Sequence, residues 1–541
     1  MNESQHVAPG AWSPLAVPMF RAMWLAILGS NIGTWMHDVA AAWMMAEATD
    51  SPLWVAAVQS ATTLPVVFLA LLAGALADIV DRRRYLLWTQ AWMCGIAALL
   101  AALAWSGMLQ PWSLLALTFA LGCGAAMAMP AQAATTSELV SRDLLPPAVA
   151  LSSISMNIAR SVGPALGGVV VAQAGPPWAF AFNAVSFAGM LAVLWVWKRP
   201  PDAGRLPREH VGDALRAGLR YAAQATVFRA VLARAASFFF FASALPALLP
   251  TLVRRDLGGE AATYGALLGC IGVGALAGAL LLPRLRARMD RDRMVLFACL
   301  LQAACIAATA ALTDPTLLGA VMLLNGASWI TVLSSFQIAA QTSVPQWVRA
   351  RALSLYIVIF ALGMGAGSLG WGALAQHASL RVALLAAAVA TALAAVWALR
   401  FRLAAVESLD VAASAHWPQP VVAEEPEGER GPVLVTVEYR VDASDRDAFL
   451  DLMAQLGRSR RRDGAVQWNV LEDVASPGTH LEYFVVASWL EHLRQHDRVT
   501  GDERRLQEGI RALQAAGHVP VVRHFVGGPA VAAATRAHRD I

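Results

Sequence analysis

Ionisable side chains lie inside long apolar stretches of this sequence, where charge is costly to bury. His37 and Asp38 fall within the apolar segment 19–45, and Arg160 falls within the segment 145–173. An ionisable group in the middle of a bilayer costs about 2.5–3.5 kcal/mol on insertion scales, so such residues are functional candidates. Either His37 or Asp38 could take up or release a proton near neutral pH.

Asp38 is the leading candidate for proton coupling. It lies 17 residues beyond Arg21, which corresponds to about 25 Å of helix at 1.5 Å per residue. That depth is past the middle of a bilayer, so a hydrogen bond or gate contact near the outer face is the alternative. Arg160 could pair with an anionic substrate group or with Asp38, and its alternative is a contact with Glu138 or a loop near its helix end.

Neutral amides in the apolar segments could line a polar cavity, although each alone is more often an interhelical hydrogen bond. The candidates are Asn157, Gln132 and Gln337. All five cysteines fall in apolar runs and no pair has the spacing of metal ligands, and no P-loop pattern occurs. We therefore expect no metal and no cofactor.

The composition determines what kind of element must hold these residues. Of 541 residues, 57% are hydrophobic and 14% are charged, whereas soluble proteins are about 45–50% apolar and about 25% charged. This excludes a soluble multidomain enzyme and a disordered chain. The net charge of +4 is small, and its basic residues form no stripe that suits nucleic acid. The lipid bilayer is therefore the expected surroundings of most of the chain.

Apolar segments long enough to cross a bilayer recur along the first 401 residues. A core of about 30 Å needs about 20 helical residues. Twelve segments satisfy this, at about 19–45, 53–77, 84–106, 111–135, 145–173, 177–197, 226–252, 261–283, 293–312, 315–340, 347–375 and 379–401. The loops after the even-numbered segments hold 17 Arg and Lys against three in the other loops, which predicts both termini in the cytoplasm.

The two groups of six segments resemble each other. Gly74 and Gly278, and Gly122 and Gly326, are each 204 residues apart. Gln132 and Gln337 are 205 apart. Repeated halves around a midplane site are the architecture of alternating-access transporters. The expected parts are two six-helix bundles at 1–197 and 226–401, a loop with an amphipathic helix at 198–225, a linker at 402–432, a domain at 433–527 and a tail at 528–541.

Residues 433–527 are expected to form a small cytoplasmic α+β domain. Segments of strand and helix character alternate as βαββαβ, with a hairpin signal at Ser476-Pro477-Gly478. That order predicts a ferredoxin-like unit. The stretch before it, 416–432, is rich in Pro and Glu and is expected to be an extended, solvated linker.

Two motifs resemble the major facilitator superfamily. In GALADIVDRRR (74–84), the resemblance implies that Gly74 permits close helix contact and that Asp78 with Arg82 forms a charge relay that closes the cytoplasmic side. ARSVGPALGG (159–168) is similar to the antiporter motif of that superfamily. Its motif residues are Gly163, Pro164, Gly167 and Gly168. The implied fold is an all-α bundle of twelve transmembrane helices in two six-helix repeats.

The stretches NIGTWMHDVAAAWMM (31–45) and NIARSVGPALGG (157–168) resemble the drug- and siderophore-exporting branch, the transmembrane secretion effector group. This implies a multi-pass protein of a bacterial cytoplasmic (inner) membrane. It would export a small organic molecule, driven by proton entry. One departure is that LLALTFALGCGAA lacks the embedded Arg that many proton-driven exporters have in segment four, so coupling through that Arg is not expected.

The C-terminal domain resembles the dimeric α+β barrels of antibiotic-biosynthesis monooxygenases. The alternative function is therefore a membrane-tethered enzyme with this domain catalytic. Twelve repeat-organised spans make a poor anchor, so we expect no enzyme and a regulatory or dimerising module instead. His492 and His496 share a helix face, but the run HLRQH lacks the internal Glu of a zincin motif.

Overall fold

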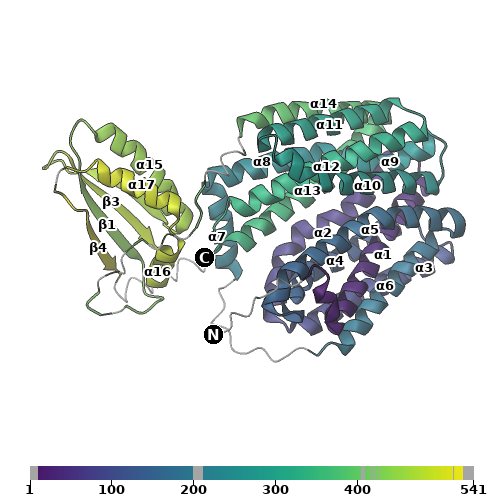
Figure 1. Cartoon of the computed structure of the whole chain (residues 1–541), viewed down its shortest axis with the longest axis horizontal. Helices are drawn as coiled ribbons and strands as arrows, with labels where there is room; N and C mark the ends of the chain where they lie inside the picture. The colour runs from purple at the N-terminus through teal and green to yellow at the C-terminus, as the bar shows by residue number, and fades with distance from the viewer. Residues whose placement is uncertain are drawn as a thin grey trace. The chain divides into compact units, whose positions relative to one another are not determined.

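The computed structural model describes residues 10–198, 211–401, 403, 409–412, 414, 416, 417, 420, 422–424, 426–515 and 517–527. The chain divides into two compact units. Unit 1 comprises 1–208, 233–337 and 356–401, and unit 2 comprises 209–232, 338–355 and 402–541. Figure 1 shows their helices and strands.

The first six expected segments each form one long helix. Five of these helices, all except α3, have proline in the first turn, where its missing N–H costs nothing. Asp81 caps α3 by accepting from the Arg84 N–H at 2.9 Å. The helices are α1 (Pro18–Ala48), α2 (Pro52–Ile79), α3 (Arg82–Trp105), α4 (Pro111–Leu139), α5 (Leu145–Ala174) and α6 (Pro176–Val196).

The second half contains seven helices because its first span is broken near Ser243. The two pieces, α8 (Thr226–Ala242) and α9 (Ala244–Arg255), together make one apolar span of 30 residues. The others are α10 (Ala261–Arg286), α11 (Arg291–Ala311), α12 (Pro315–Thr342), α13 (Arg349–His377) and α14 (Leu380–Trp397).

Among the described residues, eleven spans are long and apolar enough to cross a membrane. Twelve were expected, and the one that falls short is α1, which has 31 residues. Asn31, His37 and Asp38 lower its apolar character. The all-α membrane fold class is confirmed, and α1 is the helix with the most unusual polar content.

The buried apolar clusters at the two ends of the bundle differ in which halves contribute residues to them. We call the ends joined by the loops at 49–51, 106–110, 256–260, 312–314 and 378–379 the low-charge end, and the opposite ends the basic end. One buried cluster at the low-charge end joins both halves and includes Met36, Val58, Leu248, Tyr264 and Trp371. A cluster at the basic end, with Tyr85, Leu86 and Trp197, contains residues of the first half only.

Unit 2 contains the expected α+β domain. Its elements are β1 (Val433–Arg440), α15 (Arg446–Asp463), β2 (Gln467–Glu472), β3 (Thr479–Val486), α16 (Trp489–Arg498), α17 (Gly501–Ala512) and β4 (Val521–Val526). The sheet order is β2-β3-β1-β4 with antiparallel neighbours. The ferredoxin-like prediction is confirmed, except that the second helix is split into α16 and α17. Alternate residues of β1 are buried under the helices that cover one face of the sheet (Figure 1).

The linker is less solvated than expected. The Trp417 ring lies 4.6 Å from the guanidinium carbon of Arg460, and the Gly501 N–H donates to the Ala412 carbonyl at 3.0 Å. These described linker residues therefore pack on the domain. The expected amphipathic segment forms α7 (Val211–Gln224), which also belongs to unit 2.

Candidate functional site

The antiporter-like motif places α5 directly against α1. A Cβ built on Gly163 would lie 2.6 Å from the Trp35 Cβ, and one on Gly167 would lie 2.9 Å from the Met36 Cα. Real Cβ atoms do not approach other atoms so closely, so only glycine fits at these two positions. The motif therefore sets the distance between two helices of the first half.

The other face of the same motif meets the second half of the bundle. A Cβ on Gly168 would lie 2.6 Å from the Gly265 Cα of α10. Further along, Gly272 is in backbone contact with Ser161. The two helices thus touch backbone to backbone over several turns, as small residues permit in membrane bundles. The Pro164 carbonyl lies within this contact, 2.8 Å from a Cβ built on Gly265.

A second contact of the same kind joins α2 to α13. A Cβ on Gly372 would lie 2.6 Å from the Ala56 Cβ, and the Ser60 hydroxyl donates to the Gly365 carbonyl at 2.7 Å. Ser51 and Gln376 are hydrogen-bonded at the helix ends. Arg255 and Asp50 form an ion pair of 2.8 Å nearby. The two halves are closed on each other at the low-charge end.

Asp38 lies at the junction of α1, α5 and α10. Its neighbours Met36 and Val39 both contact Gly167, and its carboxyl lies within electrostatic range of the Tyr264 hydroxyl. Tyr264 in turn stacks on Trp43, with ring centroids 6.2 Å apart. Asp38 makes no ion pair with any residue that the structure describes. An uncompensated carboxyl thus lies where the two halves touch.

His37 points elsewhere. It is fully buried, and its ring lies 5.0 Å from the Phe180 ring of α6. Neither ring nitrogen has a hydrogen-bond partner within the described part of the chain. The adjacent residues His37 and Asp38 therefore face different helices, as successive positions on a helix do.

Arg160 and Asn157 are not brought to Asp38. Gly167 marks the level of Asp38 on α5, and Arg160 precedes it by seven residues, about 10 Å along the helix axis. Arg160 is half-buried and forms no ion pair with a described residue. The Asn157 amide donates to the Ser153 carbonyl of its own helix at 3.0 Å. These residues do not form one site with Asp38 in this conformation.

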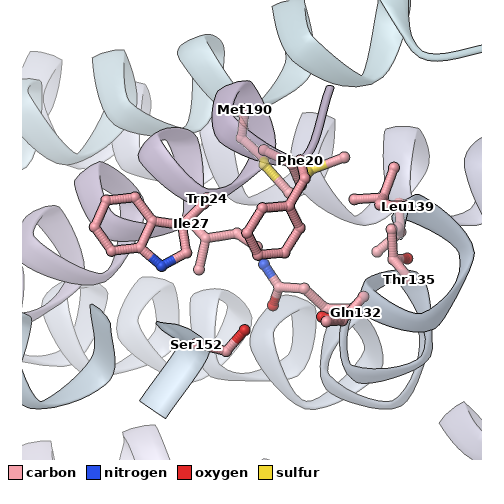
Figure 2. A pocket seen from close by; sticks show the side chains of 11 residues that line it. Phe20, Trp24, Ile27, Gln132, Thr135, Leu139, Ser152 and Met190 are labelled. Atoms are coloured by element: carbon pink, nitrogen blue, oxygen red, sulfur yellow. The ribbon is translucent and has the colours of Figure 1, made fainter. Parts of the chain in front are cut away.

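Gln132 lines a pocket at the basic end of the first half. Figure 2 shows its amide close to the ring of Phe20, with Trp24 on the same side of the pocket. The lining is aromatic or aliphatic with neutral polar groups and includes Ile27, Thr135, Leu139, Ser152 and Met190. The pocket is small in this conformation, with a free volume of about 20 Å³, and its lining offers aromatic faces and neutral hydrogen-bonding groups. Gln337, the repeat equivalent, is exposed on α12 and does not line this pocket.

The structure describes only part of the motif at 74–84, so the implied relay between Asp78 and Arg82 stays a prediction. Arg82 forms an ion pair with Glu138 at the end of α4, and both side chains are largely buried. A Cβ on Gly74 would meet nothing within 4 Å, so Gly74 makes no close helix contact with the described residues in this conformation. The side chain of Asp78 lies outside the described residues. The partner observed for Arg82 is therefore Glu138.

A buried arginine in the second half was missed from the sequence. Arg234 of α8 is 2% exposed, forms an ion pair with Asp292 of α11, and donates to the Phe401 carbonyl at 2.9 Å. It joins three parts of the second half near the basic end. The signal was visible as an arginine in the otherwise apolar run FRAVLARAASFFFF.

Three histidines of the C-terminal domain, His492, His496 and His524, have neighbouring rings, and His492 is buried. The His492 ring lies 4.8 Å from that of His524 and 5.0 Å from that of His496. Burial, with the nearby His524 and His496, lowers the pKa of His492 to about 3. Among the described residues, no three ligand-type side chains are arranged to hold a metal ion.

Comparisons with known proteins agree with this architecture. Residues 9–530 match the family described as transmembrane secretion effector. A staphyloferrin A transporter of Staphylococcus aureus is 26% identical over 47% of this chain and 64% of its own length. An enterobactin exporter EntS of Citrobacter koseri is 30% identical over 49% of this chain and 62% of its own. The matched regions thus span just under two thirds of these relatives.

Solved structures show the same fold. An inward-facing bacterial homologue of the lysosomal transporter Spinster aligns with a TM-score of 0.56 and 15% identity, over 72% of this chain and 97% of that one. A peptide transporter of the POT family aligns with a TM-score of 0.58 and 13% identity, over 76% and 99%. These relatives and neighbours are transporters, which gives no support to the alternative of a membrane-tethered enzyme. This chain belongs to the transmembrane secretion effector family of membrane transporters.

Proposed function

We propose that this chain is a secondary active exporter that moves a small organic molecule out of the cytoplasm in exchange for protons. The observation that supports this most directly is the closure of the low-charge end. There, α5 meets α10 at Gly168 and Gly265, and α2 meets α13 at Ser60 and Gly365. With both termini in the cytoplasm, as the loop charges predict, this end faces outward and the conformation is closed to the outside.

The closing surfaces suit repeated opening. The α5–α10 contact consists of backbone and small side chains, so separating the helices there breaks no ion pair. The main charged contact across the halves at this end is between Asp50 and Arg255, which are 88% and 38% exposed. An exposed pair contributes only about 0–1 kcal/mol. Separating the two halves at this end, as rocking requires, therefore costs little free energy.

Asp38 would couple the rocking to protons. When the halves close, its half-buried carboxyl lies at the junction of α1, α5 and α10 without a cationic partner among the described residues, where an uncompensated charge is costly. When the halves open, water reaches the carboxyl and the proton can leave or enter. Protonation state and conformation are then linked through one residue.

The transported molecule would be siderophore-like or drug-like. The pocket of Figure 2, with Phe20, Trp24, Gln132 and Ser152, offers aromatic faces and neutral hydrogen-bonding groups. The names of the relatives, a staphyloferrin A transporter and an enterobactin exporter, support a siderophore. We propose that this pocket binds an uncharged part of the transported molecule.

Transport in inside-out vesicles tests the proposal. A fluorescent organic cation or a siderophore should accumulate when a proton gradient is imposed, and Asp38→Asn should abolish accumulation. Asp314→Asn is the matched control, because Asp314 is an exposed helix-capping carboxylate of α12. Unchanged gradient-driven transport by Asp38→Asn would remove Asp38 from the mechanism.

The C-terminal domain would also pair with a second copy of the chain. Leu481 pairs with Leu471 on β2 and with Glu438 on β1, which itself pairs with Val521 on β4. These positions and Phe525 lie on the sheet face opposite the helices, and the four apolar side chains there are 37–52% exposed. Phe525→Asp should convert a dimer to a monomer in light scattering of the detergent-solubilised protein; a monomeric wild type would contradict this.

A further inference from the structure

Two aromatic side chains from distant parts of unit 2 form a pair. Tyr221 is at the end of α7, and Trp347 is in the turn at 343–348 between α12 and α13. Their ring centroids are 6.0 Å apart in an edge-to-face arrangement. The Tyr221 hydroxyl donates to the Ser343 carbonyl at 3.3 Å, and the side chain is 2% exposed. The pair thus attaches α7 to this turn.

Two arginines of the C-terminal domain lie against this aromatic pair. The guanidinium carbon of Arg498, at the end of α16, is 4.4 Å from the Trp347 ring centroid. That of Arg462, at the end of α15, is 5.6 Å from the Tyr221 ring centroid. Both distances are within the range of cation–π attraction. Each of two domain helices therefore supplies one cation to one ring.

Both guanidinium groups are held in place by carboxylates of the domain. Arg498 donates to Glu491 at 2.6 Å and to the Asp463 carbonyl at 3.0 Å. Arg462 makes two hydrogen bonds of 3.0 Å to the Asp463 carboxylate and pairs with Glu503. Because these groups are already ordered, contact with the rings costs little further side-chain entropy.

Glu491 adds an ionic contact to the same interface. It lies 3.6 Å from Arg220 of α7 while also holding Arg498. On the other side of α7, a Cβ on Gly218 would lie 3.0 Å from the Arg351 Cβ at the start of α13. The helix α7 is therefore enclosed between the domain and the beginning of α13.

We propose that this arginine–aromatic clasp (Tyr221, Trp347, Arg462 and Arg498) makes the C-terminal domain an autoinhibitory regulator of the bundle. Along the chain, α7 lies in the segment that connects the two six-helix halves, and the turn at 343–348 lies within the second half. All four clasp residues belong to unit 2, and fixing α7 to this turn restrains the segment through which the two halves are connected. Release of the clasp frees this segment, so the clasp opposes the rocking that opens the low-charge end.

Regulation by the clasp does not depend on which molecule is transported. It assigns a role to the domain that a catalytic or purely dimerising module would not have. The clasp gives a role to the aromatic residues of α7 and of the turn at 343–348. It also gives a role to the arginines at the ends of α15 and α16.

Hydrogen exchange of the full chain in lipid nanodiscs tests whether the clasp exists. Trp347→Ala should make the amides of 218–224 exchange roughly tenfold faster, the effect of losing one well-desolvated cation–π contact. Trp347→Phe keeps a ring and should stay close to the wild type. Arg498→Ala should reproduce Trp347→Ala from the domain side, and Arg504→Ala, on an exposed face of α17, should have no effect. Wild-type exchange at 218–224 in both alanine variants would overturn the clasp.

Labelling of Ser60→Cys from outside tests regulation without any substrate. Ser60 is buried in the α2–α13 contact, so a membrane-impermeant maleimide reports opening of that end. In Trp347→Ala and Arg498→Ala labelling should be at least threefold faster, with protection of β1 and β3 unchanged. Equal labelling rates with faster exchange at 218–224 would show a docked domain that regulates nothing, and would overturn the proposal while leaving the transport assay unaffected.

Discussion

Gly168 of α5 and Gly265 of α10 lie in backbone contact across the two halves of the bundle. A Cβ on the first would come within 2.6 Å of the Cα of the second, and one on the second would come within 2.5 Å of the Cα of the first. The motif glycines therefore do more than shape α5. They determine how closely the halves can close at the low-charge end.

Gly168→Ala should disfavour the closed state. The new methyl group meets backbone, which no rotamer change can relieve, and overpacking of this kind costs about 1–3 kcal/mol. The ratio of closed to open molecules should fall by roughly tenfold to a hundredfold. Faster maleimide labelling of Ser60→Cys in this background is the measurement.

Gly189→Ala of α6 provides the control for that substitution. A Cβ at Gly189 meets nothing within 4 Å, and alanine is the better helix former by about 1 kcal/mol. Labelling of Ser60→Cys in the Gly189→Ala protein should match the wild type. Equal labelling in both alanine variants would show that the glycine contact does not limit closure.

Glu138→Gln should destabilise the first half as much as Arg82→Gln does. Each change removes the ion pair between two largely buried side chains, at a cost of about 3 kcal/mol. Thermal unfolding of the detergent-solubilised protein measures this. The family resemblance implies instead that Asp78 is the partner of Arg82. If Asp78→Asn lowers the stability of the first half more than Glu138→Gln does, the Arg82–Glu138 assignment is contradicted.

Arg234→Met should lower the stability of the second half by about 3 kcal/mol, because it removes the buried ion pair between Arg234 and Asp292. The double exchange Arg234→Asp with Asp292→Arg should recover part of the loss. Arg229→Met in the same helix is the control, since Arg229 is exposed. Unfolding transitions of the three variants and the wild type would be compared, and a loss in Arg234→Met no larger than that in Arg229→Met would contradict the assigned role.

The C-terminal domain should lose stability in mild acid. Burial lowers the pKa of His492 to about 3 in the folded chain, below its usual value of about 6.5. Its stabilising contribution is therefore complete above pH 6.5 and is lost as pH falls toward 3, at up to about 1.4 kcal/mol per pH unit. Hydrogen exchange of β1 and β3 in the full chain at pH 7 and pH 4.5 measures this.

His492→Gln should weaken that pH dependence, because glutamine does not titrate. Burial also lowers the pKa values of His524 and His480, so a smaller acid sensitivity should remain. An unchanged slope in His492→Gln would show that other groups cause the acid sensitivity.

Much of the fold follows from local patterns, whereas the pairing of side chains does not. Apolar segment lengths, loop charges and the repeat offset predict the two bundles, and the alternation of strands and helices predicts the domain. The pair Arg82–Glu138 joins residues 56 positions apart, and Arg234–Asp292 joins residues 58 apart. Such pairs depend on helix rotation and packing, which one sequence does not specify.

In the candidate site, too, local patterns can be predicted from the sequence, but side-chain contacts cannot. The motif at Gly163, Gly167 and Gly168 predicts close packing, but it does not say which helix lies on each side. His37 and Asp38 are adjacent in sequence and were grouped as alternatives, yet a step of one residue turns them toward α6 and toward α10. The charge of Arg160 makes it a reasonable partner for Asp38. However, Gly167 lies beside Met36, so Arg160, seven residues earlier on α5, lies at a different depth from Asp38.

Transport requires the low-charge end to open, and a cross-link between α2 and α13 would block that opening. Ser51 and Gln376 are hydrogen-bonded across that contact, so Ser51→Cys with Gln376→Cys should form a disulfide on oxidation. The oxidised protein should transport at least tenfold more slowly than either single variant, and reduction should restore the rate. Undiminished transport by the fully oxidised pair would contradict the account.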